Sequence, residues 1–192
     1  MLRVNYGYNI NMTDQDIDKA ILLDASRGDL KAFDALITFY QKAIFNHLYR
    51  LVNNSDDASD LAQDTFVKLF KTRERINVEA NFKSYLYKIA TNTAYDWLKK
   101  KKNHKEDLII DDDNVNFETI EASRSYYKLE ELDRVGLDIA LEKIKLKSKN
   151  LLLLYYQQGF TYEEIAEITK QPLNTIKTGL YRAKKELLQT FD

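Results

Sequence analysis

Residues Phe160 to Phe191 read FTYEEIAEITKQPLNTIKTGLYRAKKELLQTF and contain the most informative pattern of the chain. The pattern predicts two helices joined by a tight turn. Thr161 begins the first helix, and its hydroxyl and the Glu164 carboxylate each accept from the other residue's free backbone N–H, as in a capping box. Pro172 separates the two helices, because proline cannot continue a helix but suits the first turn of a new one.

The second helix of this pair has two chemically different faces. Residues spaced three and four apart form an apolar face: Leu173, Ile176, Leu180, Ala183 and Leu187. The opposite face is polar and basic: Asn174, Thr175, Lys177, Thr178, Tyr181, Arg182 and Lys185. A helix that enters the major groove has short polar residues near its N-terminus, which reach base edges, and later cations that hold phosphates. An ordinary amphipathic hairpin with a solvated basic face has the same periodicity, so the pattern alone leaves both interpretations open.

The order G-F-T-Y-E-E-I-A, followed by N-T-I-K-T and Y-R-A-K-K-E-L, resembles the C-terminal DNA-binding domain of bacterial RNA polymerase sigma factors. The closest match is the extracytoplasmic-function (ECF) branch of the sigma-70 family. The resemblance implies that this domain docks on the −35 promoter element. Lys170 stands where the turn of the family usually has Gly, and Gly179 where an Arg commonly contacts DNA. We therefore expect Gly179→Arg to tighten DNA binding without changing sequence preference.

Composition limits the class of protein. The chain has 192 residues, of which 44% are hydrophobic and 31% charged, with only one Pro and five Gly. These values suit one or two small helical domains. No segment approaches the roughly 18 apolar residues of a membrane span, and the N-terminus lacks the pattern of a signal peptide, so we expect a cytoplasmic protein without membrane insertion. The absence of Cys excludes disulfides and thiolate metal sites.

Helical periodicity recurs along the chain without alternating strand patterns, which predicts an all-α protein of two small helical domains joined by an acidic linker. The expected organisation is an N-terminal arm (1–13), a front domain (14–105), the linker (106–134) and a helix-turn-helix back domain (135–192). The front domain should contain four helices, at residues 14–27, 29–52, 55–70 and from Phe82 onward, with a polar loop at 72–81. Asp111 to Asp113 in the linker are interpreted as part of a charged tether rather than as a cation site.

The third expected helix has a polar, acidic strip. Asp60, Gln63 and Asp64 lie three and four residues apart and therefore share one face. A solvated surface would have the same spacing. The order D-L-A-Q-D-T-F-x-K-L-F, however, resembles the segment by which sigma factors bind the coiled coil of the polymerase β′ subunit. The resemblance implies that Asp60, Gln63 and Asp64 pair with Arg residues of that coiled coil, with Phe66 in the core or at the interface rim.

The fourth expected helix, FKSYLYKIATNTAYDWLKKKK from Phe82 to Lys102, mixes aromatic, cationic and Asn residues. Such a surface binds single-stranded DNA through stacking and phosphate contacts. The resemblance implies that this helix binds the melted −10 element, and that loop 72–81 receives a flipped-out base. The expected contacts are Lys88, Asn92, Tyr95, Lys99 and Lys100. The spacing of Trp97 favours the core, and the lysine run could instead stabilise the helix C-terminus.

The sequence thus favours a transcription initiation factor that binds core RNA polymerase and promoter DNA, both duplex and single-stranded. We expect no catalytic residue, metal or cofactor, since the two His, His47 and His104, lack metal-ligand spacing. Three alternatives stay open: a stand-alone helix-turn-helix regulator with a sensing or dimerising front domain, a metal-dependent hydrolase, and an adaptor that binds polymerase without DNA. Family members are commonly held by an anti-sigma factor, but nothing in the sequence marks a site for one.

Overall fold

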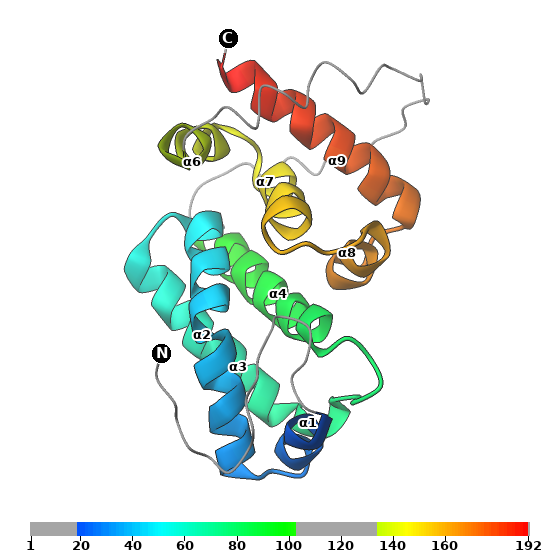
Figure 1. The fold of residues 1–192 in the computed structure, drawn as a ribbon. Coiled ribbons are helices and arrows are strands. Elements are labelled where there is room, and N and C mark those ends of the chain that lie inside the picture. The colour runs from blue at the N-terminus through cyan, green and yellow to red at the C-terminus, as the bar shows by residue number, and fades with distance from the viewer. Residues whose placement is uncertain (1–18, 103–133, 192) are drawn as a thin grey trace.

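The computed structural model describes residues 19–102 and 134–191. The expected N-terminal arm, nearly all of the acidic linker and His104 lie outside the described residues. Within them every regular element is helical and no strand occurs, which confirms the all-α fold class. The helices form a front and a back group, at the bottom and the top of Figure 1.

The front group consists of α1 (Lys19–Ser26), α2 (Leu30–Val52), α3 (Ser55–Lys71) and α4 (Phe82–Lys102), with a 3₁₀ turn, η1 (Arg73–Arg75), between the last two. Local chemistry sets their ends. The Asp29 carboxylate accepts from the backbone N–H of Ala32 at 2.8 Å and caps α2. Asn53 ends α2 in the left-handed conformation, and the Asn54 side chain caps α3. The expected helix starts at Asp29 and Phe82 are therefore confirmed.

The back group consists of α6 (Arg134–Lys143), α7 (Leu146–Leu152), a π-helical turn η2 (Leu153–Gln157), α8 (Tyr162–Thr169), α9 (Leu173–Leu188) and a final 3₁₀ turn η3 (Gln189–Phe191). The predicted capping box is present: the Thr161 N–H donates to Glu164 Oε2 at 2.8 Å, and the Glu164 N–H donates to Thr161 Oγ1 at 3.2 Å. The apolar stripe of α9 is buried at Ile176, Leu180, Ala183 and Leu187, and the helix packs mainly on α7.

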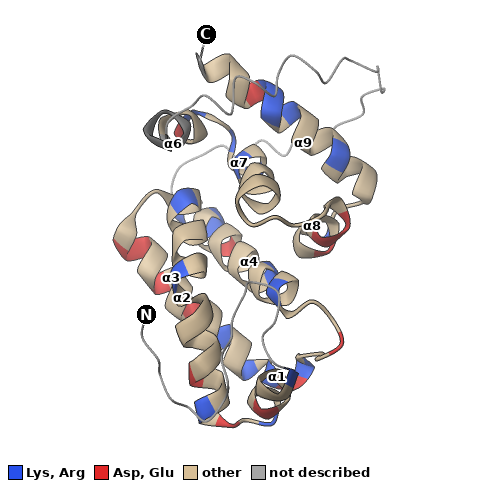
Figure 2. Ribbon diagram, viewed as in Figure 1, with Lys and Arg blue, Asp and Glu red and all other residues tan. Residues whose placement is uncertain are grey.

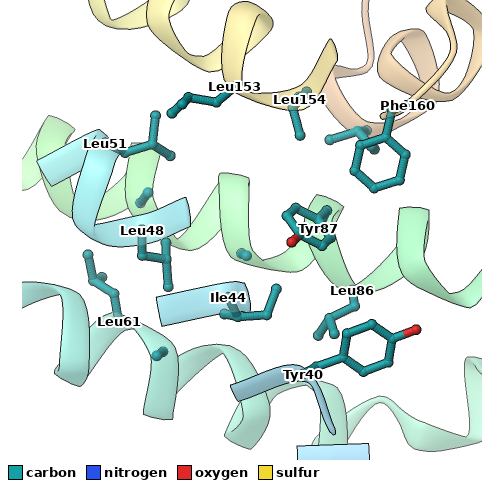
Figure 3. Packing of buried hydrophobic residues seen from close by; sticks show 14 of the residues in the cluster. Tyr40, Ile44, Leu48, Leu51, Leu61, Leu86, Tyr87, Leu153, Leu154 and Phe160 are labelled. Atoms are coloured by element: carbon teal, nitrogen blue, oxygen red, sulfur yellow. The ribbon is translucent and has the colours of Figure 1, made fainter. Parts of the chain in front are cut away.

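The two groups are in contact rather than only tethered. Helix α4 of the front group packs against α8, and α2 touches α7. Figure 3 shows Tyr87 of α4 facing Phe160, and Leu51 of α2 on the side of Leu153. All four side chains are buried. Apolar residues of the two groups therefore share one continuous core, which the sequence did not predict.

The turn of the helix-turn-helix contains Lys170, where the family usually has Gly. Lys170 ends α8 with φ 56° and ψ 38°, in the left-handed region. For a residue with a Cβ, that conformation destabilises the folded state by about 1–2 kcal/mol. Gly avoids this cost, but it also gives the unfolded chain more conformational entropy, which offsets part of the gain. We expect Lys170→Gly to raise the free energy of unfolding by about 0.5 kcal/mol, measured by urea denaturation.

A matched glycine variant tests the cause. Glu167 is exposed within α8, where Gly should instead lower the free energy of unfolding by about 1 kcal/mol. Equal effects of the two substitutions would show that the left-handed conformation of Lys170 carries no appreciable strain.

Candidate DNA and polymerase interface

The acidic strip of α3 is exposed as expected. The side chains of Asp60, Gln63 and Asp64 are exposed, and within the described parts of the chain neither carboxylate forms an ion pair. These carboxylates are therefore available to cations of another molecule.

Phe66 does not belong to this strip. It is buried with 7% of its surface exposed, on the stripe formed with Ala62 and Leu69. Of the two positions that the resemblance allowed, the structure shows the core. Val67, one residue on, is 49% exposed and lies three and four residues from Asp64 and Gln63, so it supplies the apolar part of the strip. The spacing of Phe66 from Ala62 already indicated this, because residues four apart share a face.

The proposed strand-binding residues on α4 differ in exposure. Lys99 and Lys100 are exposed, whereas Lys88 and Asn92 are half-buried. The Tyr95 side chain is also half-buried, but its hydroxyl is desolvated, and this burial raises the pKa of Tyr95 to about 12. Asn150 of α7 approaches this hydroxyl and partly opposes that pKa shift, although neither amide atom of Asn150 forms a hydrogen bond of ordinary geometry. The five residues therefore do not form one open surface in this arrangement.

Side chains near the C-terminal end of α4 form intramolecular contacts. The Lys101 ammonium lies 3.2 Å from the Asp57 carboxylate of α3 and 4.3 Å from the centre of the Trp97 ring. Trp97 is half-buried and packs against the core, and it also lines an open groove of about 360 Å³ between α3 and α4. Asp64, Lys68, Lys99 and Lys100 also line this groove. Lys101 thus contacts α3 while its side chain stays 62% exposed, and Lys99 and Lys100 are exposed as well.

The proposed DNA-facing side of α9 is largely exposed. Asn174, Thr175, Lys177 and Lys185 are exposed, and Tyr181 is 49% exposed. Thr178 and Arg182 are half-buried, and the Thr178 hydroxyl donates to the backbone oxygen of Asn174 at 2.9 Å. In Figure 2 basic segments recur along α9, while α8 carries acidic ones. The cations needed for phosphate contact are therefore concentrated on the second helix.

Gly179 does not lie on the open side of α9. A Cβ built at this position would come within 2.8 Å of Leu151 Cδ1, and Leu151 is buried in α7. Gly at this point permits the close approach of α7 and α9. The expected benefit of Gly179→Arg is therefore wrong, because the larger side chain first has to displace a core leucine.

Among residues 19–102 and 134–191, no group of His, Cys, Asp or Glu is placed to hold a metal ion. No helix in these ranges is both long and apolar enough to cross a bilayer. His47 is fully buried in α2, with neither ring nitrogen hydrogen-bonded to a described residue.

Comparison with known proteins identifies both halves of the chain. The family model described as Sigma-70 region 2 matches residues 36–104, and the model described as Sigma-70, region 4 matches residues 136–187. RNA polymerase sigma factor SigV of Bacillus subtilis is 32% identical over 78% of this chain and 84% of its own length. The ECF RNA polymerase sigma-E factor of Haemophilus influenzae is 29% identical over 91% of this chain and 95% of its own length.

A solved structure agrees with these relatives. The sigma factor RpoE of Bartonella quintana, in complex with the anti-sigma factor NepR, has a TM-score of 0.64 and 26% identity, over 83% of this chain and 96% of that one. Two helical domains in this order, the second a helix-turn-helix, define a transcription initiation factor that works with RNA polymerase and promoter DNA. The chain belongs to the ECF RNA polymerase sigma factors of the sigma-70 family. This assignment takes the place of the stand-alone regulator and adaptor alternatives.

Proposed function

We propose that three surfaces of this sigma factor bind three different targets. The acidic strip of α3 (Asp60, Gln63, Asp64 and Val67) binds the β′ coiled coil of core polymerase. The polar face of α9 binds the −35 duplex, and α4 with loop 72–81 binds the melted −10 strand. The observation that carries this proposal is the polar, basic face of α9, exposed on a helix whose opposite face is buried.

Run-off transcription tests the proposal as a whole. Core polymerase, with and without this protein, would be supplied with the DNA upstream of the protein's own coding sequence. We expect a discrete transcript only with the protein present. Equal transcription without it would contradict the proposed role.

Salt dependence tests the α9 surface separately. We expect Lys177→Ala and Lys185→Ala each to weaken binding of the reconstituted holoenzyme to that DNA. Each should also lower the slope of log affinity against log salt by about 0.9 for every phosphate that the protein no longer neutralises. The measurement is an anisotropy titration over a series of salt concentrations.

Lys147→Ala is the matched control, since Lys147 is an exposed lysine of α7, outside the proposed surface. An unchanged slope in both α9 variants, or an equal change in the control, would remove these lysines from the DNA contacts.

We further infer that the protein performs no covalent chemistry of its own, acts in the cytoplasm beside the polymerase, and is restrained by an anti-sigma factor. The complex of the Bartonella quintana relative with NepR supports the last of these. The test is to purify a tagged form of the chain. We expect an inhibitory partner to co-purify with it and to dissociate before transcription begins.

A further inference from the structure

The turn between α1 and α2 depends on a glycine. Gly28 has φ 93°, in the left-handed region where a residue with a Cβ is strained. The backbone N–H of Gly28 donates to the Ala25 oxygen at 3.0 Å. The N–H of the next residue, Asp29, donates to the Asp24 oxygen, also at 3.0 Å. These two hydrogen bonds form the Schellman motif that ends many helices, so the turn is fixed by its own backbone.

One arginine of the proposed base-binding loop lies against this glycine. A Cβ built on Gly28 would come within 3.3 Å of Arg73 Nε and 3.9 Å of its Cζ. The guanidinium therefore occupies space that the side chain of any other residue at position 28 would need. Arg73 begins the η1 turn, near the start of loop 72–81. In Figure 1 α1 lies beside the segment that joins α3 to α4, and α1 contacts η1.

Two further contacts hold the Arg73 side chain. Its Nη1 donates to the backbone oxygen of Phe70, at the end of α3, at 3.1 Å. Its Cζ lies 4.7 Å from the centre of the Phe70 ring, which meets the Phe33 ring of α2 edge-on with 5.0 Å between centroids. The helix dipole favours a cation at a C-terminus, and a cation near an aromatic ring is attracted to it. Arg73 thus connects the end of α3 to the α1–α2 turn.

The hydrogen-bonding of Arg73 is nevertheless incomplete. Its Nε is buried without a hydrogen-bond partner among the described residues. A buried donor without a partner destabilises the folded state, so stability alone does not account for this placement. The position of the guanidinium is set instead by its fit against Gly28 and Phe70. A methyl group on Gly28 would therefore displace it.

The next part of loop 72–81 is fixed to the same turn. The Thr72 hydroxyl lies 3.0 Å from the Tyr85 hydroxyl of α4. The Ile76 side chain is buried with 7% of its surface exposed, and its N–H donates to the Arg73 oxygen at 2.9 Å. The conformation of this part of the loop therefore follows the position of Arg73.

Exposed polar side chains flank the buried Ile76. Arg75 and Asn77 are both exposed. An Arg can pair with a phosphate, and an Asn offers a donor and an acceptor to a base edge. We propose that Arg73 is a positioning residue for the melted strand: packed against Gly28, it sets the loop conformation in which Arg75 and Asn77 meet the strand. The proposal rests on the strand-binding role of loop 72–81 proposed above.

The family model does not contain both partners of this contact. The region 2 model matches residues 36–104, so Arg73 lies within the matched segment and Gly28 precedes it. Gly28 has no side chain with which to bind DNA. Any effect of Gly28→Ala on strand binding that depends on Arg73 would therefore be transmitted through the loop.

A double-mutant cycle tests this transmission. Wild type, Gly28→Ala, Arg73→Ala and the double variant would each be combined with core polymerase, below saturation, on the DNA upstream of the protein's own coding sequence. We expect each single variant to give about tenfold less permanganate-reactive thymine, as for a loop that keeps its binding conformation in about one-tenth of the molecules. The double variant should match Arg73→Ala. Affinity for core polymerase, measured by competition, should be unchanged in all four.

Two variants control for backbone strain and for charge. Gly159 also has a positive φ, of 73°, but a Cβ built there has no neighbour within 4 Å. Gly159→Ala should therefore lower the free energy of unfolding, measured with urea, without reducing the opening of DNA. Arg73→Lys keeps the charge but lacks the planar group that fits against Gly28, so it should open DNA no better than Arg73→Ala.

Several outcomes would overturn the proposal. Full opening by Arg73→Lys would show that the charge acts on the strand directly. A further loss when Gly28→Ala is added to Arg73→Ala would show that the glycine acts through the fold as a whole. Unchanged opening by either single alanine variant would also overturn it, and one of the two suffices if the other does not fold. Absence of reactive thymine with every protein, wild type included, would instead count against the proposed function.

Discussion

Reversing two charges on α3, Asp60→Lys with Asp64→Lys, should lower the affinity for core polymerase by about 100-fold, equivalent to about 2.7 kcal/mol. Both carboxylates are exposed, so folding should change little. An attraction toward Arg residues of the β′ coiled coil would become a repulsion, and like charges brought together at an interface cost several kcal/mol. Competition with a labelled sigma factor for core polymerase measures the effect, and thermal unfolding verifies the fold.

Glu167→Lys with Glu163→Lys is the matched control, since it makes the same change in net charge at exposed positions of α8. It should leave the affinity for core polymerase within about twofold, because only screened long-range charge effects remain. An equal loss in the control would mean that net charge, rather than the strip, determines binding. A compensating Arg→Glu change in the β′ coiled coil should restore part of the affinity of the α3 variant.

Local signals in the sequence predicted most of the helices. The cap at Asp29, the capping box of Thr161 and Glu164, and the start of α4 at Phe82 all depend on residues within one helical turn. Such signals act before any tertiary contact and can be recognised from residue order alone. The exposed acidic strip of α3 follows from the same kind of spacing.

The interdomain interface could not be predicted in this way. Periodicity shows that a face of α4 is apolar or polar, but it does not show which distant segment covers it. Tyr87 is buried between His47 of α2 and Phe160 of the back domain, and Gln158, the partner of its hydroxyl, lies 71 residues away in the chain. The error over Gly179 has the same origin, because the close approach of Leu151 is a tertiary fact.

Acid should destabilise this protein through a single histidine. His47 of α2 is fully buried beside the Tyr87 ring, with 5.1 Å between ring centroids, and its burial lowers the pKa to about 3. The unfolded chain, with the ordinary pKa of 6.5, binds this proton between about pH 6.5 and 3 while the folded protein does not. The contribution of neutral His47 to the free energy of unfolding is therefore fully present above pH 6.5. Below that value it falls by about 1.4 kcal/mol for each unit of pH.

The variant His47→Leu isolates this contribution. From pH 7 to pH 5 the wild type should lose about 2 kcal/mol more free energy of unfolding than the variant, as measured by urea denaturation at each pH. At pH 7 the variant should be equally stable or more stable, because Leu fills a similar volume and leaves no buried ring nitrogen without a partner. His47→Gln, which cannot titrate but keeps polar atoms, should also remove the pH dependence while being less stable than the Leu variant.

Comparing the wild type with His47→Leu and His47→Gln distinguishes the effect of the charge on His47 from the effect of packing. Parallel stability curves for wild type and both variants between pH 7 and 5 would assign the acid sensitivity to other groups.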